Sequence, residues 1–325
     1  MYRIVRTYNA ETTTMARIED FESQLQATVE ECAEIPSFSS YQPYCVNFAE
    51  RRLVLAKPPQ GRFDLGAPFF YYDQRRTAHS LLQVPFEKLH QFDQGENMSP
   101  TFILSPGRTG STLLLNMLRA AGGGTVSEPD VFTNVARHRS AADTSWRRYE
   151  LALLRVAVAM FRGELGDSPI IKLRGSCNAI VSELAQAFGQ ARFVFILRNR
   201  ESWAQSLVRS FGFNLDKMVQ TLATCVTAID QLRARGANTA VAWYEDLLSS
   251  PSETVGALCP SELGLVERQR MAEAMARDSQ AGTPLARSRL PAVGMTPEQS
   301  SSFEAAWRDH AVRSILAPND LERLR

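Results

Sequence analysis

The feature that most constrains this chain is the segment SPGRTGST (105–112), which follows the short apolar segment TFILS (101–105). A helix is predicted to begin at Ser111, so the segment forms the turn between a strand and a helix. Such a turn presents successive backbone N–H groups, and the helix adds the positive end of its dipole. Thr112 adds a second hydroxyl donor and Arg108 a forked cation. These residues predict a cradle for an anion, because an ordinary capped turn requires neither an arginine nor two glycines.

This anion loop differs from the loop that binds nucleoside triphosphates. That motif has the form G-x-x-x-x-G-K-[ST], whereas here no lysine precedes Ser111 and the glycines are only three residues apart. In nucleotide hydrolases a partner strand also ends in an acidic residue that holds Mg²⁺. The apolar strand predicted over 193–197 ends instead in Arg198-Asn199-Arg200. The pattern indicates an anion that is bound without a metal.

Arg198 and Ser206 form a second candidate anion site. Arg198 ends a buried strand, and Ser206 follows eight residues later in the next predicted helix. Helix geometry lets this serine face the strand end, so both side chains are expected to hold one phosphate. Taken alone, this spacing is better explained by a surface arginine and a serine on a helix flank.

Together, these two segments resemble the donor-binding motifs of the sulfotransferases. PGRTGSTLL resembles the 5′-phosphosulfate loop of that family, and FVFILRNRESWAQS resembles its 3′-phosphate motif. The segments SPIIKLRGS (168–176) and WYEDLLSSP (243–251) also fit, so the resemblance covers roughly residues 100–260. The Arg-Thr-Gly-Ser form is similar to that of the carbohydrate, tyrosyl-protein and bacterial branches.

The resemblance implies a P-loop-like, doubly wound α/β fold and 3′-phosphoadenosine 5′-phosphosulfate (PAPS) as the sulfonate donor. The donor leaves as 3′-phosphoadenosine 5′-phosphate (PAP), and no metal is implied. Arg198 and Ser206 would hold the 3′-phosphate, and Lys172 matches the family lysine near the transferring sulfonate. The residues that would hold the 5′-phosphosulfate are Arg108, Thr109, Gly110, Ser111 and Thr112.

The catalytic base is the point where the chain departs from the cytosolic branch. There a histidine lies two residues after the family lysine, but this chain has Arg174, which stays protonated. We expect Glu128 to be the base, because it follows a short strand at the carboxyl edge of the predicted sheet. Branches with an arginine-type loop also tend to carry a glutamate in this region. Without the resemblance, a surface glutamate before a proline turn is as good an interpretation. His138 is the second choice, although the flanking Arg137 and Arg139 disfavour its protonated form.

The organisation of the chain changes near residue 98. From residue 99 to 325, short apolar strands alternate with helices, which is typical of a parallel sheet covered on both faces. Residues 1–98 are expected to form an extension that packs on this domain and contributes to the acceptor pocket. Within the extension, apolar residues spaced by three or four predict a helix over 16–32. The aromatic run 69–72 fits either core packing or a wall of the acceptor pocket.

Two later segments complete the prediction. The Pro-, Gly- and Ser-rich stretch 282–302 predicts a long ordered loop or lid. Its residues Arg287 and Arg289 either close over the nucleotide, as a basic segment often does in the family, or are solvated loop charges. In Tyr244-Glu245-Asp246, a structural role is expected, with Glu245 fixing loop backbone near the site.

The composition of the chain argues against nucleic acid and a membrane as binding partners. Lys and Arg number 36 and Asp and Glu 35, so no strongly basic field favours nucleic acid. No apolar run approaches the roughly 20 residues of a membrane helix, and the N-terminus lacks the layout of a secretory signal. We expect a cytoplasmic enzyme that acts on a small molecule, with no membrane partner. The alternatives are a P-loop kinase or nucleotide hydrolase, and a non-catalytic anion-binding module of the same fold.

Overall fold

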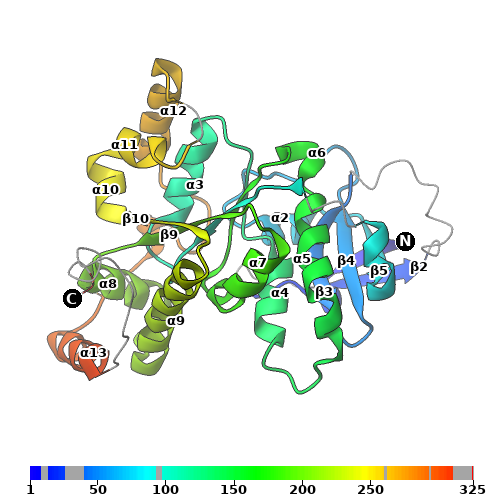
Figure 1. Cartoon of the computed structure of the whole chain (residues 1–325), viewed down its shortest axis with the longest axis horizontal. Coiled ribbons are helices and arrows are strands. Elements are labelled where there is room, and N and C mark those ends of the chain that lie inside the picture. Colours follow the sequence, from blue (N-terminus) through cyan, green and yellow to red (C-terminus); the bar gives the residue numbers. More distant parts are fainter. Residues whose placement is uncertain are drawn as a thin grey trace. The chain divides into compact units, whose positions relative to one another are not determined.

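Two β-sheets organise the chain in this computed structural model (Figure 1). The structure describes residues 1–8, 14–25, 40–92, 97–259, 262–292, 294–309 and 324. The chain divides into two compact units. Unit 1 consists of Met1–Thr101, Gly124–Leu173 and Glu183–Ala191, and unit 2 of Phe102–Gly123, Arg174–Ser182 and Arg192–Arg325. The expectation that residues 1–98 contribute to the acceptor pocket stays a prediction.

The first sheet belongs to unit 1 and is antiparallel, with the strand order β2-β1-β5-β4-β3. Its strands are β1 (Tyr2–Thr7), β2 (Phe21–Leu25), β3 (Gln42–Asn47), β4 (Arg52–Lys57) and β5 (Ser80–Pro85). The apolar centres of β4 and β5 are buried, whereas most residues of β1 are exposed, as its alternating sequence suggests. The helix α4 (Asp130–His138) packs on β3 (Figure 1).

The helix predicted over 16–32 is wrong for the part of that range that the structure describes. Ile18–Asp20 form a short 3₁₀ helix and Phe21–Leu25 form β2, while residues 26–32 lie outside the described residues. The spacing of Ile18, Phe21 and Leu25 suggested one helix face. Pairing with β1, in which Leu25 lies opposite Tyr2, outweighs this short local pattern.

The second sheet has the strand order β10-β9-β6-β8-β7. Its strands are β6 (Thr101–Leu104), β7 (Thr125–Ser127), β8 (Ile170–Lys172), β9 (Arg192–Leu197) and β10 (Asn238–Trp243). The pairs β10–β9 and β7–β8 are parallel. Helices alternate with these strands along the chain, so the expected α/β fold with a five-stranded parallel sheet flanked by helices is confirmed.

The helices that follow the anion loop are close to those predicted. The α-helices not yet given are α2 (Phe70–Thr77), α3 (Ser111–Ala120), α5 (Glu150–Ala159), α6 (Arg162–Leu165), α7 (Val181–Ala187), α8 (Arg200–Phe211), α9 (Leu215–Ala234), α10 (Tyr244–Ser249), α11 (Pro251–Gly256), α12 (Leu265–Ala276) and α13 (Pro297–Asp309). In unit 2, α12 packs on α3 and α13 on α9. The loop expected over 282–302 is shorter than predicted, because α13 begins at Pro297. No described helix has the length and apolar character needed to cross a lipid bilayer.

The aromatic run at the start of α2 belongs to the core of unit 1. Phe70 is fully buried and makes edge contacts with Phe63 and Phe161, at ring-centroid distances of 5.9 and 5.7 Å. Tyr71 is 1% exposed, and Phe69 packs beside it. These contacts confirm the core-packing interpretation of these three rings.

Candidate functional site

Three residues of the loop between β6 and α3 have left-handed backbone conformations. These are Gly107 (φ +81°), Arg108 (φ +59°) and Gly110 (φ +86°). Glycine takes this conformation freely, but an arginine rarely does, and such outliers concentrate at functional sites. Gly110 is also the N-cap of α3, where no described side chain caps the helix. The turn and the helix start therefore form the concave group of N–H donors that an anion requires.

Two side chains of unit 2 hold this loop and the end of β9 in place. Trp203 of α8 donates from Nε1 to the carbonyl oxygen of Gly107, at 2.8 Å. Glu245 accepts at Oε1 from the backbone N–H of Asn199, at 3.1 Å. The second bond confirms the structural role expected for Glu245, because Asn199 directly follows Arg198.

Tyr244 lies between the anion loop and Arg198. A Cβ atom at Gly110 would approach Cδ2 of the Tyr244 ring to 2.3 Å, so the loop backbone packs directly on that ring. The guanidinium carbon of Arg198 lies 4.5 Å from the centroid of the same ring, in a cation–π contact. One aromatic ring therefore sets the spacing between the loop and the arginine that ends β9.

Arg108 and Arg198 carry positive charge in a partly dry environment. Burial is the largest cause that lowers the pKa of each, and the nearby charge of Arg209 lowers both further. Both guanidinium groups stay protonated. The Nε atoms of Arg108 and Arg198 are buried, and within the described residues neither has a hydrogen-bond acceptor. A bound anion would supply the missing acceptor and add negative charge beside both guanidinium groups.

Glu128 and Lys172 form an ion pair in unit 1, between Oε1 and Nζ. Their side chains are only 13% and 4% exposed. The backbone adds to this pairing, because the N–H of Glu128 donates to the carbonyl oxygen of Lys172 at 2.7 Å. Glu128 also has a left-handed φ of +55°. The structure thus brings the predicted base, Glu128, into contact with Lys172, which matches the family lysine near the transferring sulfonate.

A family model described as "Sulfotransferase domain" matches residues 102–277, which is more than half of the 325-residue chain. The chain belongs to the sulfotransferase domain family. The matched range contains both anion-binding segments and the Glu128–Lys172 pair, and it confirms the resemblance drawn from the motifs.

Several solved structures are similar to this sulfotransferase domain, all at low identity. A sulfotransferase from Mycobacterium tuberculosis has 14% identity and a TM-score of 0.40, over 57% of this chain and 74% of that chain. Retinol dehydratase in complex with androsterone and inactive cofactor PAP has 12% identity and a TM-score of 0.41, over 86% and 98%. A sulfotransferase from Alicyclobacillus acidocaldarius has 13% identity and a TM-score of 0.38, over 66% and 92%. No curated protein sequence matches the chain.

The hydroxyl groups predicted to bind the donor of this sulfotransferase are buried. Thr109 is fully buried, and its Oγ1 has no hydrogen-bond partner within the described part of the chain. Ser111 and Thr112, at the start of α3, are 7% and 5% exposed. Ser206 lies in α8 and is 6% exposed. That Ser206 and Arg198 together bind one phosphate stays a prediction.

The segment that follows α12 contacts the anion loop region of the sulfotransferase domain. Gln280 donates from Nε2 to Oγ1 of Thr112, at 2.9 Å. Asp278 accepts from the backbone N–H of Arg287, at 2.8 Å, and its charge raises the pKa of Arg108 against the effect of burial. The Arg287 charge in turn lowers the pKa of Arg198. Arg287 itself is exposed, so whether its side chain contacts the nucleotide or only solvent stays a prediction.

Sequence reasoning missed Arg209, which is close enough to Arg108 and Arg198 to lower the pKa of both. Arg209 follows Ser206 by three residues on α8, and residues three apart lie on one face of a helix. That spacing could have identified it. Gln280 offered no comparable signal, because its contact with Thr112 joins segments that are 168 residues apart.

His138, the second choice for the base, takes part in aromatic packing. Its ring stacks on Phe48 at a centroid distance of 3.7 Å and contacts Trp146 edge-on. Burial lowers its pKa. It is the last residue of α4, about 12 Å along the helix from the first residue, Asp130, which follows Glu128 closely. The packing of its ring indicates a structural role for His138, and the choice of Glu128 as the base stays a prediction.

Within the part of the sulfotransferase that the structure describes, no three histidine, cysteine or acidic side chains are grouped as metal ligands would be. The groups that can bind an anion are guanidinium groups, hydroxyls and backbone N–H groups.

Proposed function

We propose that this sulfotransferase transfers a sulfonate group from PAPS to a hydroxyl or amine of a small-molecule acceptor. The observation that carries the proposal is a pair of half-buried arginines, Arg108 and Arg198, whose buried Nε atoms have no hydrogen-bond acceptor within the described residues. The two arginines belong to separate segments, and the Tyr244 ring packs on the loop backbone of one and on the guanidinium of the other. PAPS carries one anionic group at its 5′ end and another at its 3′ end. A site with two separated arginines suits a nucleotide of that kind.

In this proposal the two arginines divide the donor between them. Arg108 and the loop residues Thr109, Gly110, Ser111 and Thr112 hold the 5′-phosphosulfate. Arg198 and Ser206 hold the 3′-phosphate, and Arg209 and Arg287 add positive charge beside Arg198. The 3′-phosphate then distinguishes the donor from ADP and ATP.

Glu128 is the proposed base. Its carboxylate accepts the proton of the acceptor hydroxyl or amine while the acceptor atom forms a bond to sulfur. The bond between sulfur and the bridging oxygen of the 5′-phosphate breaks, and PAP leaves with the electron pair. Lys172 and Arg108 stabilise the charge that develops on the sulfonate oxygens and on the bridging oxygen. Most of the work of the protein is positioning and charge stabilisation, as in phosphoryl transfer.

The first experiment compares thermal unfolding of the protein with PAP, with ADP, and with ATP plus Mg²⁺. A ligand at 100 times its dissociation constant stabilises the folded state by about 2.7 kcal/mol, which raises the midpoint by several degrees. We expect stabilisation by PAP without a metal. Stabilisation by ATP with Mg²⁺ and none by PAP would instead favour the kinase or hydrolase alternative.

A second experiment separates an enzyme from a non-catalytic module. The protein is incubated with PAPS and a panel of phenols, alcohols, sugars and amines, and PAP release is measured. Wild-type protein should release PAP with at least one acceptor, and Glu128→Gln should bind PAP but release little. Tight PAP binding with no product from any acceptor would favour the non-catalytic module.

A further inference from the structure

The backbone on the N-terminal side of Glu128 is tied to two other segments of unit 1. Ser127 donates from Oγ to the carbonyl oxygen of Pro68, at 2.7 Å, and Glu128 donates its N–H to Lys172. Glu128 keeps a left-handed φ of +55°. A residue with a side chain holds that conformation only where its surroundings over-determine it. The contacts on the C-terminal side of Glu128 therefore matter as much as those before it.

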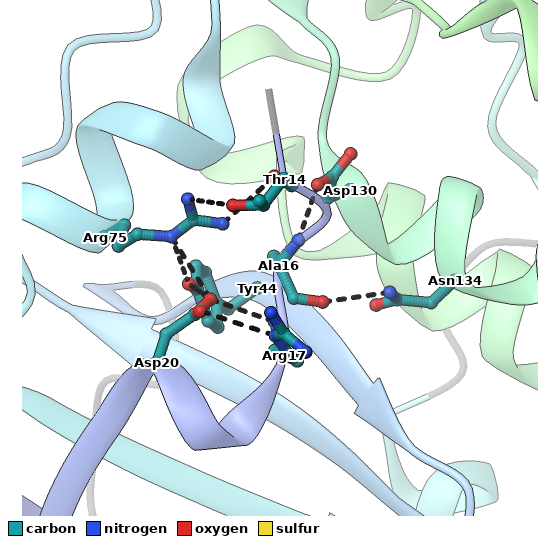
Figure 2. A network of polar contacts seen from close by, with 8 residues as sticks. All are labelled: Thr14, Ala16, Arg17, Asp20, Tyr44, Arg75, Asp130 and Asn134. Atoms are coloured by element: carbon teal, nitrogen blue, oxygen red, sulfur yellow. Dashed lines mark hydrogen bonds and ion pairs between the residues drawn. The ribbon is translucent and has the colours of Figure 1, made fainter. Parts of the chain in front are cut away.

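On that side, the first turns of α4 are tied to both backbone groups of Ala16 (Figure 2). Asp130 accepts at Oδ2 from the N–H of Ala16, at 2.7 Å, and Asn134 donates from Nδ2 to its carbonyl oxygen, at 3.0 Å. Asn134 also accepts at Oδ1 from the N–H of Val46 in β3, at 2.9 Å. Asp130 is fully buried and Asn134 is 4% exposed. Loss of one of these bonds would therefore leave a buried polar group without a partner, which is unfavourable.

The segment that carries Ala16 is itself fixed by a buried ionic cluster, which Figure 2 shows beside it. Arg75 of α2 donates to Oγ1 and the carbonyl oxygen of Thr14, at 3.0 and 3.2 Å, and to Oδ2 of Asp20, at 3.1 Å. The hydroxyl of Tyr44 donates to the same carboxylate oxygen. Arg75 and Asp20 are 0% and 1% exposed, and a buried charge left without its partner is strongly unfavourable. The cluster therefore gives Ala16 one defined position.

We infer that Asp130 and Asn134 are positioning residues for Glu128, and that they act by fixing the start of α4 to the N-terminal segment at Ala16. The inference rests on the proposed function, because it takes Glu128 as the base. Asp130 is only two residues from Glu128, so the turn between them transmits a shift of the helix start to the carboxylate. A base must lie within hydrogen-bond reach of the proton it takes, and an error of about 1 Å costs roughly a hundredfold in rate.

The test uses Asp130→Ala, with Asp130→Asn as the conservative variant and Tyr44→Phe as the control. Asn at 130 keeps an oxygen that can accept from Ala16, whereas Ala removes it. Tyr44→Phe removes only the bonds of the Tyr44 hydroxyl to Asp20 and Arg75, and leaves the bonds from Arg75 to Thr14 and from Ala16 to α4 in place. In steady-state sulfation assays well below the unfolding midpoints, Asp130→Ala should lower kcat by about tenfold or more, with the acceptor KM and the PAP affinity nearly unchanged. Asp130→Asn should recover most of kcat, and Tyr44→Phe should lower the unfolding midpoint without lowering kcat.

Wild-type kcat in a folded Asp130→Ala protein would overturn the inference. So would an equal loss of kcat in Tyr44→Phe, because generic destabilisation would then explain both variants. If Asp130→Ala does not fold, Asn134→Ala replaces it, with the same expected result.

Hydrogen exchange separates this inference from the proposed function. In Asp130→Ala, the backbone amides of Ser127, Glu128, residue 130 and Val131 should exchange faster than in the wild type, whereas Tyr44→Phe should leave them unchanged. That comparison needs no turnover, so it still tests the inference if the wild-type protein binds PAP but releases no product. Unchanged exchange of these amides in Asp130→Ala would overturn the inference. Absence of PAP binding by the wild type would instead count against the proposed function.

Discussion

Replacing Gly110 by alanine tests the packing that joins the anion loop to Tyr244. A Cβ atom at Gly110 would lie 2.3 Å from Cδ2 and 2.7 Å from Cε2 of the Tyr244 ring. Carbon atoms in contact are normally about 3.5–4.0 Å apart, so either the ring or the loop must move. Because Arg198 stacks on the same ring, a displaced ring also changes the position of that arginine.

The matched control is Gly107→Ala, in the same loop. Gly107 has a similar φ of +81°, but a Cβ atom there would meet nothing within 4 Å. The left-handed conformation costs alanine about 1–2 kcal/mol at both positions. Only Gly110→Ala adds the cost of an off-rotamer ring, about 0.5–1.5 kcal/mol, and the loss of a cation–π contact, about 0.5–2 kcal/mol. The excess of about 1–3.5 kcal/mol is the part that depends on Tyr244.

Calorimetric titration of PAP into the wild type and both variants measures this excess. Since about 1.4 kcal/mol corresponds to tenfold in affinity, we expect Gly110→Ala to bind PAP about five- to three-hundredfold more weakly than Gly107→Ala. Urea unfolding of the same proteins checks that both are folded. Equal PAP affinities in the two folded variants would refute the argument that Tyr244 couples the loop to Arg198.

Three further predictions concern single side chains. Glu128→Gln should lower turnover by about 10²–10⁴-fold while calorimetry finds PAP affinity unchanged, and turnover within about twofold of the wild type would remove Glu128 as the base. Arg209→Ala should weaken PAP binding by about tenfold or more, as expected for a hydrogen bond to a charged group, whereas Arg289→Ala, an exposed arginine, should not. Similar affinities in these two variants would contradict a donor-binding role for Arg209. Burial lowers the pKa of His138, so the unfolded chain binds a proton there more readily than the folded protein. The stability that this shift contributes is present above the unfolded pKa and is lost as pH falls through it. His138→Phe should therefore make the free energy of unfolding, measured in urea, less dependent on pH between about 7 and 5, and an unchanged pH dependence would contradict this reasoning.

The sequence predicted those elements whose signals are local. The apolar strand predicted over 193–197 lies within β9 (Arg192–Leu197), and the helix predicted to contain Ser206 is α8 (Arg200–Phe211). Asn199 explains why α8 begins where it does, because its side chain accepts from the N–H groups of Glu201 and Ser202. The anion loop was equally predictable, since its glycines, its arginine and the helix that follows lie within a few residues of one another.

Features that depend on contacts between distant segments could not be predicted. In the described part of the range 16–32, β2 forms instead of the expected helix because it pairs with β1, and no local sequence pattern predicts that pairing. The contact between Ala16 and Asp130 spans 114 residues, and the helix α4 that it ties down was not predicted at all. Hydrophobic periodicity reports which face of an element is buried, but it does not report which element buries it.

The predicted roles of Arg108 and Arg198 also depend on a contact between distant segments. Both depend on Tyr244, which lies in neither of the two anion-binding segments. Each arginine is predicted from the strand that it follows, but neither strand sets the spacing between the anion loop and Arg198. Tyr244 sets the spacing between the loop backbone at Gly110 and Arg198, because its ring packs on Gly110 and lies under the guanidinium of Arg198. A ring accepts a cation without neutralising it, so Arg198 keeps a charge that a carboxylate neighbour in the same place would have cancelled. Glu245, the adjacent carboxylate, instead has one oxygen engaged by the backbone of Asn199. Tyr244 and Glu245 thus set the position of Arg198, and the Glu245 charge raises the pKa of Arg198 against the effect of burial, which keeps this arginine a cation that can bind an anion.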